Sequence, residues 1–286
     1  MKTGLSASAL KTIAIITMFI DHLGYTLIYE LDARGTFNFI TGGKVDLAVY
    51  SAFRLIGRIA FVIFCFLLVE GFFHTSDRKK YALRLMCGAV ISEIPFDLMC
   101  EKKLIDRTYQ NVFFTLLIGF VTVWAVDTIL SRDRSRILRI LACAGVILAG
   151  LTLAEVIRSD YSSLGVGLIL VFYFFRYNKA ALLIAAFAEY FIGHIISDLI
   201  SWIITGTGRY GLSYIRNLIS ADLAKTLLYL SRNVIGQMVG VLTALILIMT
   251  YNHSRGRQLP KYFYYAFYPV HMLALYCILR LYLHYF

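Results

Sequence analysis

Two groups of polar residues interrupt apolar stretches of the sequence at spacings that could support chemistry. In the stretch LKTIAIITMFIDHLGY, residues 10–25, Lys11 and His22 are separated by ten residues. At about 100° per residue along a helix they share one face, about 16 Å apart. Neutral histidine is suited to taking up a proton, because its pKa lies near physiological pH. Alternatively, Lys11 extends to the lipid head groups and His22 only makes a helix contact.

The stretch from Phe53 to Lys80 carries charged residues within an apolar run. Arg54 and Arg58 are four residues apart and therefore lie on one helix face, and Glu70 follows about three turns later. An arginine at the centre of a bilayer costs roughly 2.5–3.5 kcal/mol, so such residues usually face a polar cavity or a partner. Interhelical ion pairs that hold a bundle together are the alternative interpretation.

Further polar residues occur at the ends of later apolar stretches. They are Glu93, Asp97, Gln110, Asn111 and His271. Asp21 points about 100° away from its neighbour His22 along a helix, so it is a poor direct orienter of that imidazole. A carboxylate from another helix, such as Glu93 or Asp97, is a better candidate for that role. Together, these groups indicate a water-filled active cavity within a bundle.

The elements that would position these residues are membrane helices. The chain has 286 residues, of which 59% are hydrophobic and 16% charged, whereas soluble domains are about 45–50% apolar and about 25% charged. Apolar runs of about 20 residues recur along its length, which is typical of transmembrane helices. We therefore predict an all-α, polytopic transmembrane helical bundle that forms a single domain over residues 1–286.

Nine helices account for the apolar runs. They are predicted over residues 9–29, 48–73, 79–100, 111–130, 136–157, 162–177, 179–203, 225–250 and 261–284. An additional short or re-entrant helix between 162 and 232 would make ten. The order of the runs shows no internal repeat of the kind found in many transporters.

The distribution of Lys and Arg among the loops predicts the orientation. Nine helices place thirteen basic residues on the side of the N-terminus and nine on the other side. Because cytoplasmic loops are enriched in Lys and Arg, we predict a multi-pass protein of the plasma membrane with a cytoplasmic N-terminus and an external C-terminus. The net charge of +11 fits contact with anionic membrane lipid or an anionic substrate. The basic residues are scattered among short loops, which argues against nucleic-acid binding.

The cysteines and histidines do not form a metal-binding pattern. The five cysteines lie mostly in apolar stretches without disulfide or metal-ligand spacing. The six histidines form no HExxH motif and no clustered ligand set. We therefore expect no metal.

Several blocks of the sequence resemble the TraX family. They are LKTIAIITMFIDHLG, GRIAFVIFCFLLVEGFFHTSDRKKY, ISEIPFDL, QNVFFTLLIG and KYFYYAFYPVHMLAL. A further block, DYSSLGVG, has Ser162 where glycine is usual. The resemblance implies acetylation of the N-terminal amine of a pilin subunit. The spacing of Lys11 and His22 is also similar to that in membrane acyltransferases that O-acetylate surface glycans, in which the histidine is the proposed base and cytoplasmic acetyl-CoA is the donor.

The resemblance implies an integral membrane acetyltransferase that uses acetyl-CoA and a protein amine, a glycan or a small molecule as acceptor. His22 would act as base or carry the acetyl group itself. The expected catalytic residues are His22, Asp21, Arg58, Glu93 and Asp97; Lys11, Arg54 and Arg58 would bind acetyl-CoA; Gln110, Asn111 and His271 would bind the acceptor. Arg58 could instead stabilise the oxyanion of the tetrahedral intermediate. A secondary transporter and a non-catalytic assembly factor are the alternative functions.

Overall fold

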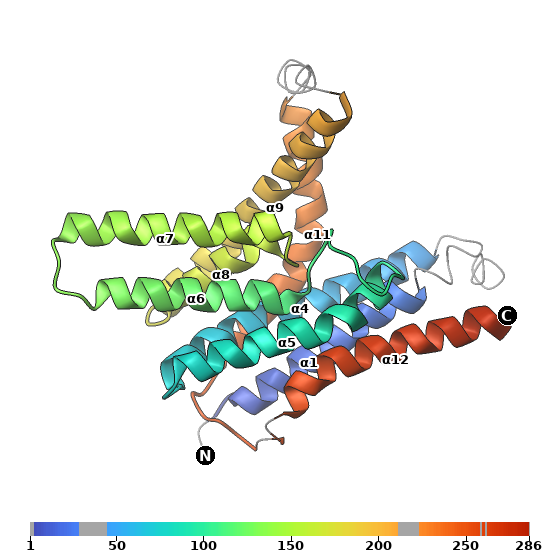
Figure 1. The fold of residues 1–286 in the computed structure, drawn as a ribbon, viewed down its shortest axis with the longest axis horizontal. Helices are drawn as coiled ribbons and strands as arrows, with labels where there is room; N and C mark the ends of the chain where they lie inside the picture. Colours follow the sequence, from blue (N-terminus) through green and yellow to red (C-terminus); the bar gives the residue numbers. More distant parts are fainter. Residues whose placement is uncertain (1–2, 29–44, 211–222, 258, 261, 286) are drawn as a thin grey trace.

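A computed structural model describes residues 3–28, 45–210, 223–257, 259–260 and 262–285 of the chain (Figure 1). The described residues form nine α-helices and one short π-helix, which confirms the predicted all-α bundle. The α-helices are α1 (Ala7–Leu23), α4 (Val45–His74), α5 (Arg78–Cys100), α6 (Val112–Leu130), α7 (Arg136–Ile157), α8 (Ser162–Phe175), α9 (Lys179–Tyr210), α11 (Leu223–Met249) and α12 (Phe263–Tyr285). The π-helix, Gly24–Ile28, continues α1. A tenth helix was considered between residues 162 and 232, and residues 211–222 of that region lie outside the described residues.

Capping side chains fix where several of these helices begin. Ser6, Asp77 and Asn111 each accept a backbone N–H of the first turn, in α1, α5 and α6, at 3.2, 2.9 and 3.0 Å. Each cap satisfies one of the N–H groups that have no partner inside the helix. The predicted and observed helix starts therefore agree closely at these three points.

Six helical segments are long and apolar enough to cross a membrane, which makes the chain a multi-pass membrane protein. They are Ala7–Ile28, Val49–His74, Val112–Leu130, Arg136–Ile157, Lys179–Ile196 and Phe263–Tyr285. The helix α7 leaves much of its apolar surface uncovered by protein, with Leu148 and Val156 66% and 74% exposed. Such a surface suits contact with lipid chains.

The helices around the candidate site come from both ends of the sequence. The helix α1 lies along α4, and α12 lies against α5 and α1, whereas α6 and α7 form a hairpin that projects to one side (Figure 1). Lys11 Nζ lies 5.3 Å from the ring centre of Tyr264, and His22 contacts His271. These two contacts show that α1 and α12 run parallel, so the start of α1 and the end of α12 lie at opposite ends of the bundle.

Ion pairs join helices at the end of α4 that is distant from His22. The Arg176 guanidinium donates to Glu70 Oε1 at 3.0 Å, and the two side chains are only 14% and 7% exposed. Arg78 donates to Asp127 at 2.8 Å, which links α5 to α6. For Glu70, the structure therefore supports the interhelical ion pair.

Candidate active site

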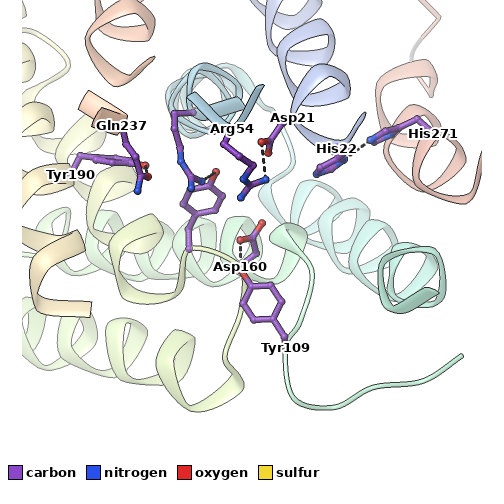
Figure 2. A network of polar contacts seen from close by, with 10 residues as sticks. Asp21, His22, Arg54, Tyr109, Asp160, Tyr190, Gln237 and His271 are labelled. Atoms are coloured by element: carbon purple, nitrogen blue, oxygen red, sulfur yellow. Dashed lines mark hydrogen bonds and ion pairs between the residues drawn. The ribbon is translucent and has the colours of Figure 1, made fainter. Parts of the chain in front are cut away.

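His22, at the end of α1, and His271, in the middle of α12, face each other (Figure 2). The distance from His22 Nδ1 to His271 Nε2 is 2.6 Å, and the two ring planes differ by 3°. His271 Nδ1 lies 2.7 Å from the Phe267 carbonyl oxygen. His271 is buried and His22 is half-buried. The structure thus pairs His22, the expected base, with His271, which the sequence suggested only as a residue that binds the acetyl acceptor.

Asp21 is paired with Arg54 across the contact between α1 and α4 (Figure 2). Arg54 donates to Asp21 Oδ1 at 2.7 Å, and their side chains are 28% and 10% exposed. Gly57 makes this approach possible, because a Cβ atom at that position would lie 2.2 Å from Asp21 Cγ. The carboxylate therefore balances an arginine rather than orienting His22, in agreement with its direction on the helix.

Arg58 lies one turn further along α4 and carries an unsatisfied donor. Its Nη1 donates to the Tyr161 hydroxyl at 2.9 Å. Its Nε is buried and has no hydrogen-bond partner. A buried N–H without an acceptor costs about 1–3 kcal/mol, more for a charged group, so this nitrogen is suited to an acceptor atom of a bound molecule.

Two loops close the site on the side of α6 and α8. Backbone hydrogen bonds from Gln110 N to Arg158 O (3.1 Å) and from Asp160 N to Gln110 O (2.8 Å) join them. The Tyr109 hydroxyl donates to Asp160 Oδ1 at 2.5 Å (Figure 2). Burial raises the pKa of Asp160, and this effect is opposed by the hydrogen bond from Tyr109 and by the positive charge of Arg58. The arginines of α4 therefore lie near polar side chains in the loops that follow α5 and α7.

The residues Tyr109, Asp160 and Tyr161 were missed as site residues from the sequence. The signal that could have found them is their position, since they border or belong to blocks of the TraX resemblance. Tyr161 and Ser162 adopt φ angles of 64° and 38°, in the left-handed region that favours glycine. This conformation gives a physical reason why a glycine would fit at position 162. The same turn directs the Tyr161 hydroxyl to Arg58.

Glu93 and Asp97 are hydrogen-bonded to residues that follow α5. Glu93 accepts a hydrogen bond from the Asn111 amide, and Asp97 accepts the backbone N–H of Asp106 at 2.7 Å. One oxygen of each carboxylate is buried without a partner. The imidazole of His22 is instead hydrogen-bonded to His271.

The remaining expected contacts are spread along the bundle. Asn111 caps α6 and also donates to the Ala89 carbonyl at 2.8 Å, and Gln110 is held by its backbone in the bridge to Ser159. Lys11 faces α12, as His22 does, which agrees with the predicted shared face of α1. Within the described ranges, no group of three His, Cys, Asp or Glu residues could hold a metal ion.

A family model described as "TraX protein" matches residues 6–279. The chain belongs to the TraX family. It is also similar to a "Probable fimbrial assembly protein FimC, serogroup H1" from Dichelobacter nodosus, at 31% identity over 125 residues. That match covers 41% of this chain and 45% of the relative, so less than half of that protein's length is spanned. No solved structure matches the chain.

In this member of the TraX family, separate sequence blocks meet in one cluster of polar groups. The first block contributes Asp21 and His22, the second contributes Arg58, and the last contributes His271. DYSSLGVG contributes Asp160, whose carboxylate is affected by the charge of Arg58. A histidine beside fixed cationic donors is an arrangement that can exchange protons and stabilise a developing negative charge.

Proposed function

We propose that this protein is an integral membrane acetyltransferase that moves an acetyl group from acetyl-CoA to an amine or hydroxyl acceptor. The observation that carries this proposal is the His22 imidazole, which is hydrogen-bonded to His271 in a membrane-spanning bundle and lies near the positive charge of Arg54. Membership of the TraX family and the name of the fimbrial relative favour a pilus subunit's N-terminal amine as acceptor.

His22 is the base in the proposed reaction. It takes a proton from the acceptor nitrogen or oxygen as that atom bonds to the acetyl carbon. The carbon–sulfur bond of the thioester breaks, and the departing CoA thiolate takes the proton from the imidazolium. Histidine suits both proton transfers because its pKa lies near the working pH. In a variant of this scheme, His22 carries the acetyl group between donor and acceptor.

The arginines supply the positive charge that this reaction needs. We assign Arg58 to the oxygen of the tetrahedral intermediate, because its Nε is a buried donor without a partner. We assign Arg54 to carbonyl groups of the donor. Lys11, about 16 Å from His22 along α1, would contact phosphate groups of acetyl-CoA. These roles agree with a plasma-membrane protein that takes acetyl-CoA from the cytoplasm and has its N-terminus on that side.

The test uses purified full-length protein in detergent with acetyl-CoA labelled in the acetyl group. We would measure release of free CoA and the location of the label, with a pilin-like peptide that carries a free N-terminal amine as acceptor. The same peptide with a blocked amine, and His284→Ala on the exposed end of α12, are the controls. We expect label on the free-amine peptide, and a loss of about 10²–10⁴-fold in rate for His22→Ala.

The result separates this function from its alternatives. CoA release by the parent and undiminished by His22→Ala would refute the role of His22. A transporter would release no CoA from acetyl-CoA at all. A non-catalytic assembly factor would also release none, and in that case His22→Ala would only lower the melting temperature.

A further inference from the structure

The hydrogen bonds of His271 determine which nitrogen of His22 carries a proton. A carbonyl oxygen can only accept, so His271 Nδ1, 2.7 Å from the Phe267 oxygen, must be the donor. Neutral imidazole has one N–H, and His271 Nε2 therefore has a lone pair. The 2.6 Å contact with His22 Nδ1 then requires the hydrogen on His22. This leaves the lone pair of His22 on Nε2.

A charged His271 would reverse this assignment, but its surroundings oppose a second proton. His271 is 5% exposed and packs against the rings of Phe19 and Phe267. In the part of the chain that the structure describes, neither imidazole forms an ion pair with a carboxylate. Arg54 adds positive charge near His22. A buried cation without a counter-charge is strongly unfavourable, so the neutral pair is the stable form.

We propose that His271 is a positioning residue that holds His22 in its Nδ1–H tautomer and keeps Nε2 free as base or nucleophile. This inference rests on the proposed acetyl transfer. It gives His271 a role other than binding the substrate that accepts the acetyl group. When Nε2 takes up a proton, Nδ1–H stays hydrogen-bonded to the lone pair of His271, which stabilises the imidazolium. The tautomer of a histidine is generally set by the hydrogen bond of its other nitrogen.

The test combines spectroscopy with turnover in the full-length protein. Histidine labelled with ¹⁵N distinguishes protonated from unprotonated ring nitrogens, and His22→Gln identifies the His22 signals. We would compare His271→Gln, whose side-chain oxygen can still accept from Nδ1–H, with His271→Leu, which cannot. His284→Leu, on the same helix and exposed, is the matched control.

The expected results differ among the variants. The parent, His271→Gln and His284→Leu should show a protonated Nδ1 and an unprotonated Nε2 at His22. In His271→Leu both tautomers should appear, and kcat should fall about 100-fold, compared with at most about tenfold for His271→Gln. Melting temperatures would show whether a variant has lost its fold; if His271→Leu has, the tautomer of His22 in the parent decides.

Two results would overturn the proposal. One is a parent protein in which His22 Nε2 carries the proton. The other is a folded His271→Leu that keeps both the parent tautomer and the parent kcat. If the parent itself transfers no acetyl group, the proposed function fails, while the ¹⁵N spectra still decide whether His271 sets the tautomer.

Discussion

Replacing Gly57 by alanine should disrupt the contact between α1 and α4 at the candidate site. The new Cβ would lie 2.2 Å from Asp21 Cγ and 2.4 Å from Asp21 Cβ and Oδ1, whereas real Cβ contacts essentially never fall below 3.0 Å. The Asp21 side chain is held by Arg54 at 2.7 Å, so it cannot turn away without losing this ion pair. The backbone of the two helices must therefore move apart, or the pair must break.

The expected loss of stability follows from three terms. Overfilling a close helix contact costs about 1–3 kcal/mol. Loss of the ion pair adds about 1–2 kcal/mol, less than for a fully buried pair because the Arg54 side chain is 28% exposed. Alanine is favoured over glycine within a helix by about 1 kcal/mol, which offsets part of the loss. We expect a net destabilisation of about 1–4 kcal/mol.

The measurement is the melting temperature of the purified protein in detergent. Gly145→Ala in α7 is the matched control, because its new methyl group would meet nothing within 4 Å. That variant should melt at or slightly above the parent temperature. Gly57→Ala should melt at a lower temperature than the parent. In an Asp21→Gly background, where the clashing atoms are absent, the same substitution should lower the melting temperature less. A Gly57→Ala protein as stable as Gly145→Ala would refute the close contact described here.

Three further predictions concern positions away from His22. Arg176→Leu leaves Glu70 buried without its partner and should cost about 3–5 kcal/mol, largely recovered when Glu70→Leu is added; melting temperatures would show this. At Ser162, with φ of 38°, a valine should cost about 1–2 kcal/mol while a glycine should be tolerated, which the same assay would reveal. Hydrogen bonds from Lys103 and Thr108 lower the pKa of Asp106, so its stabilising effect is present above the usual carboxyl pKa and is lost as the pH falls through the lowered value. Accordingly, Asp106→Ala should speed amide hydrogen exchange at Thr108 near neutral pH but make little difference in strong acid.

The sequence by itself determined the helices and the directions of residues along each of them. Apolar runs of membrane-spanning length fix a bundle, because a backbone in lipid must satisfy its own hydrogen bonds. The 100° rotation per residue correctly placed Lys11 and His22 on one face and turned Asp21 away from His22. These are local properties, and they do not depend on which helices are neighbours.

Only the tertiary structure decided which polar groups meet. His22 and His271 are 249 positions apart, and no periodicity within either helix indicates that α1 and α12 lie side by side. Glu93 and Asp97 were plausible partners for His22 by type, yet α5 directs them to the loop that follows it. The Tyr109 and Asp160 pair escaped notice because it joins two loops, whose contacts depend on how the helices that carry them pack. Helix faces are set by local geometry, whereas the match between faces is set by side-chain fit across the whole bundle.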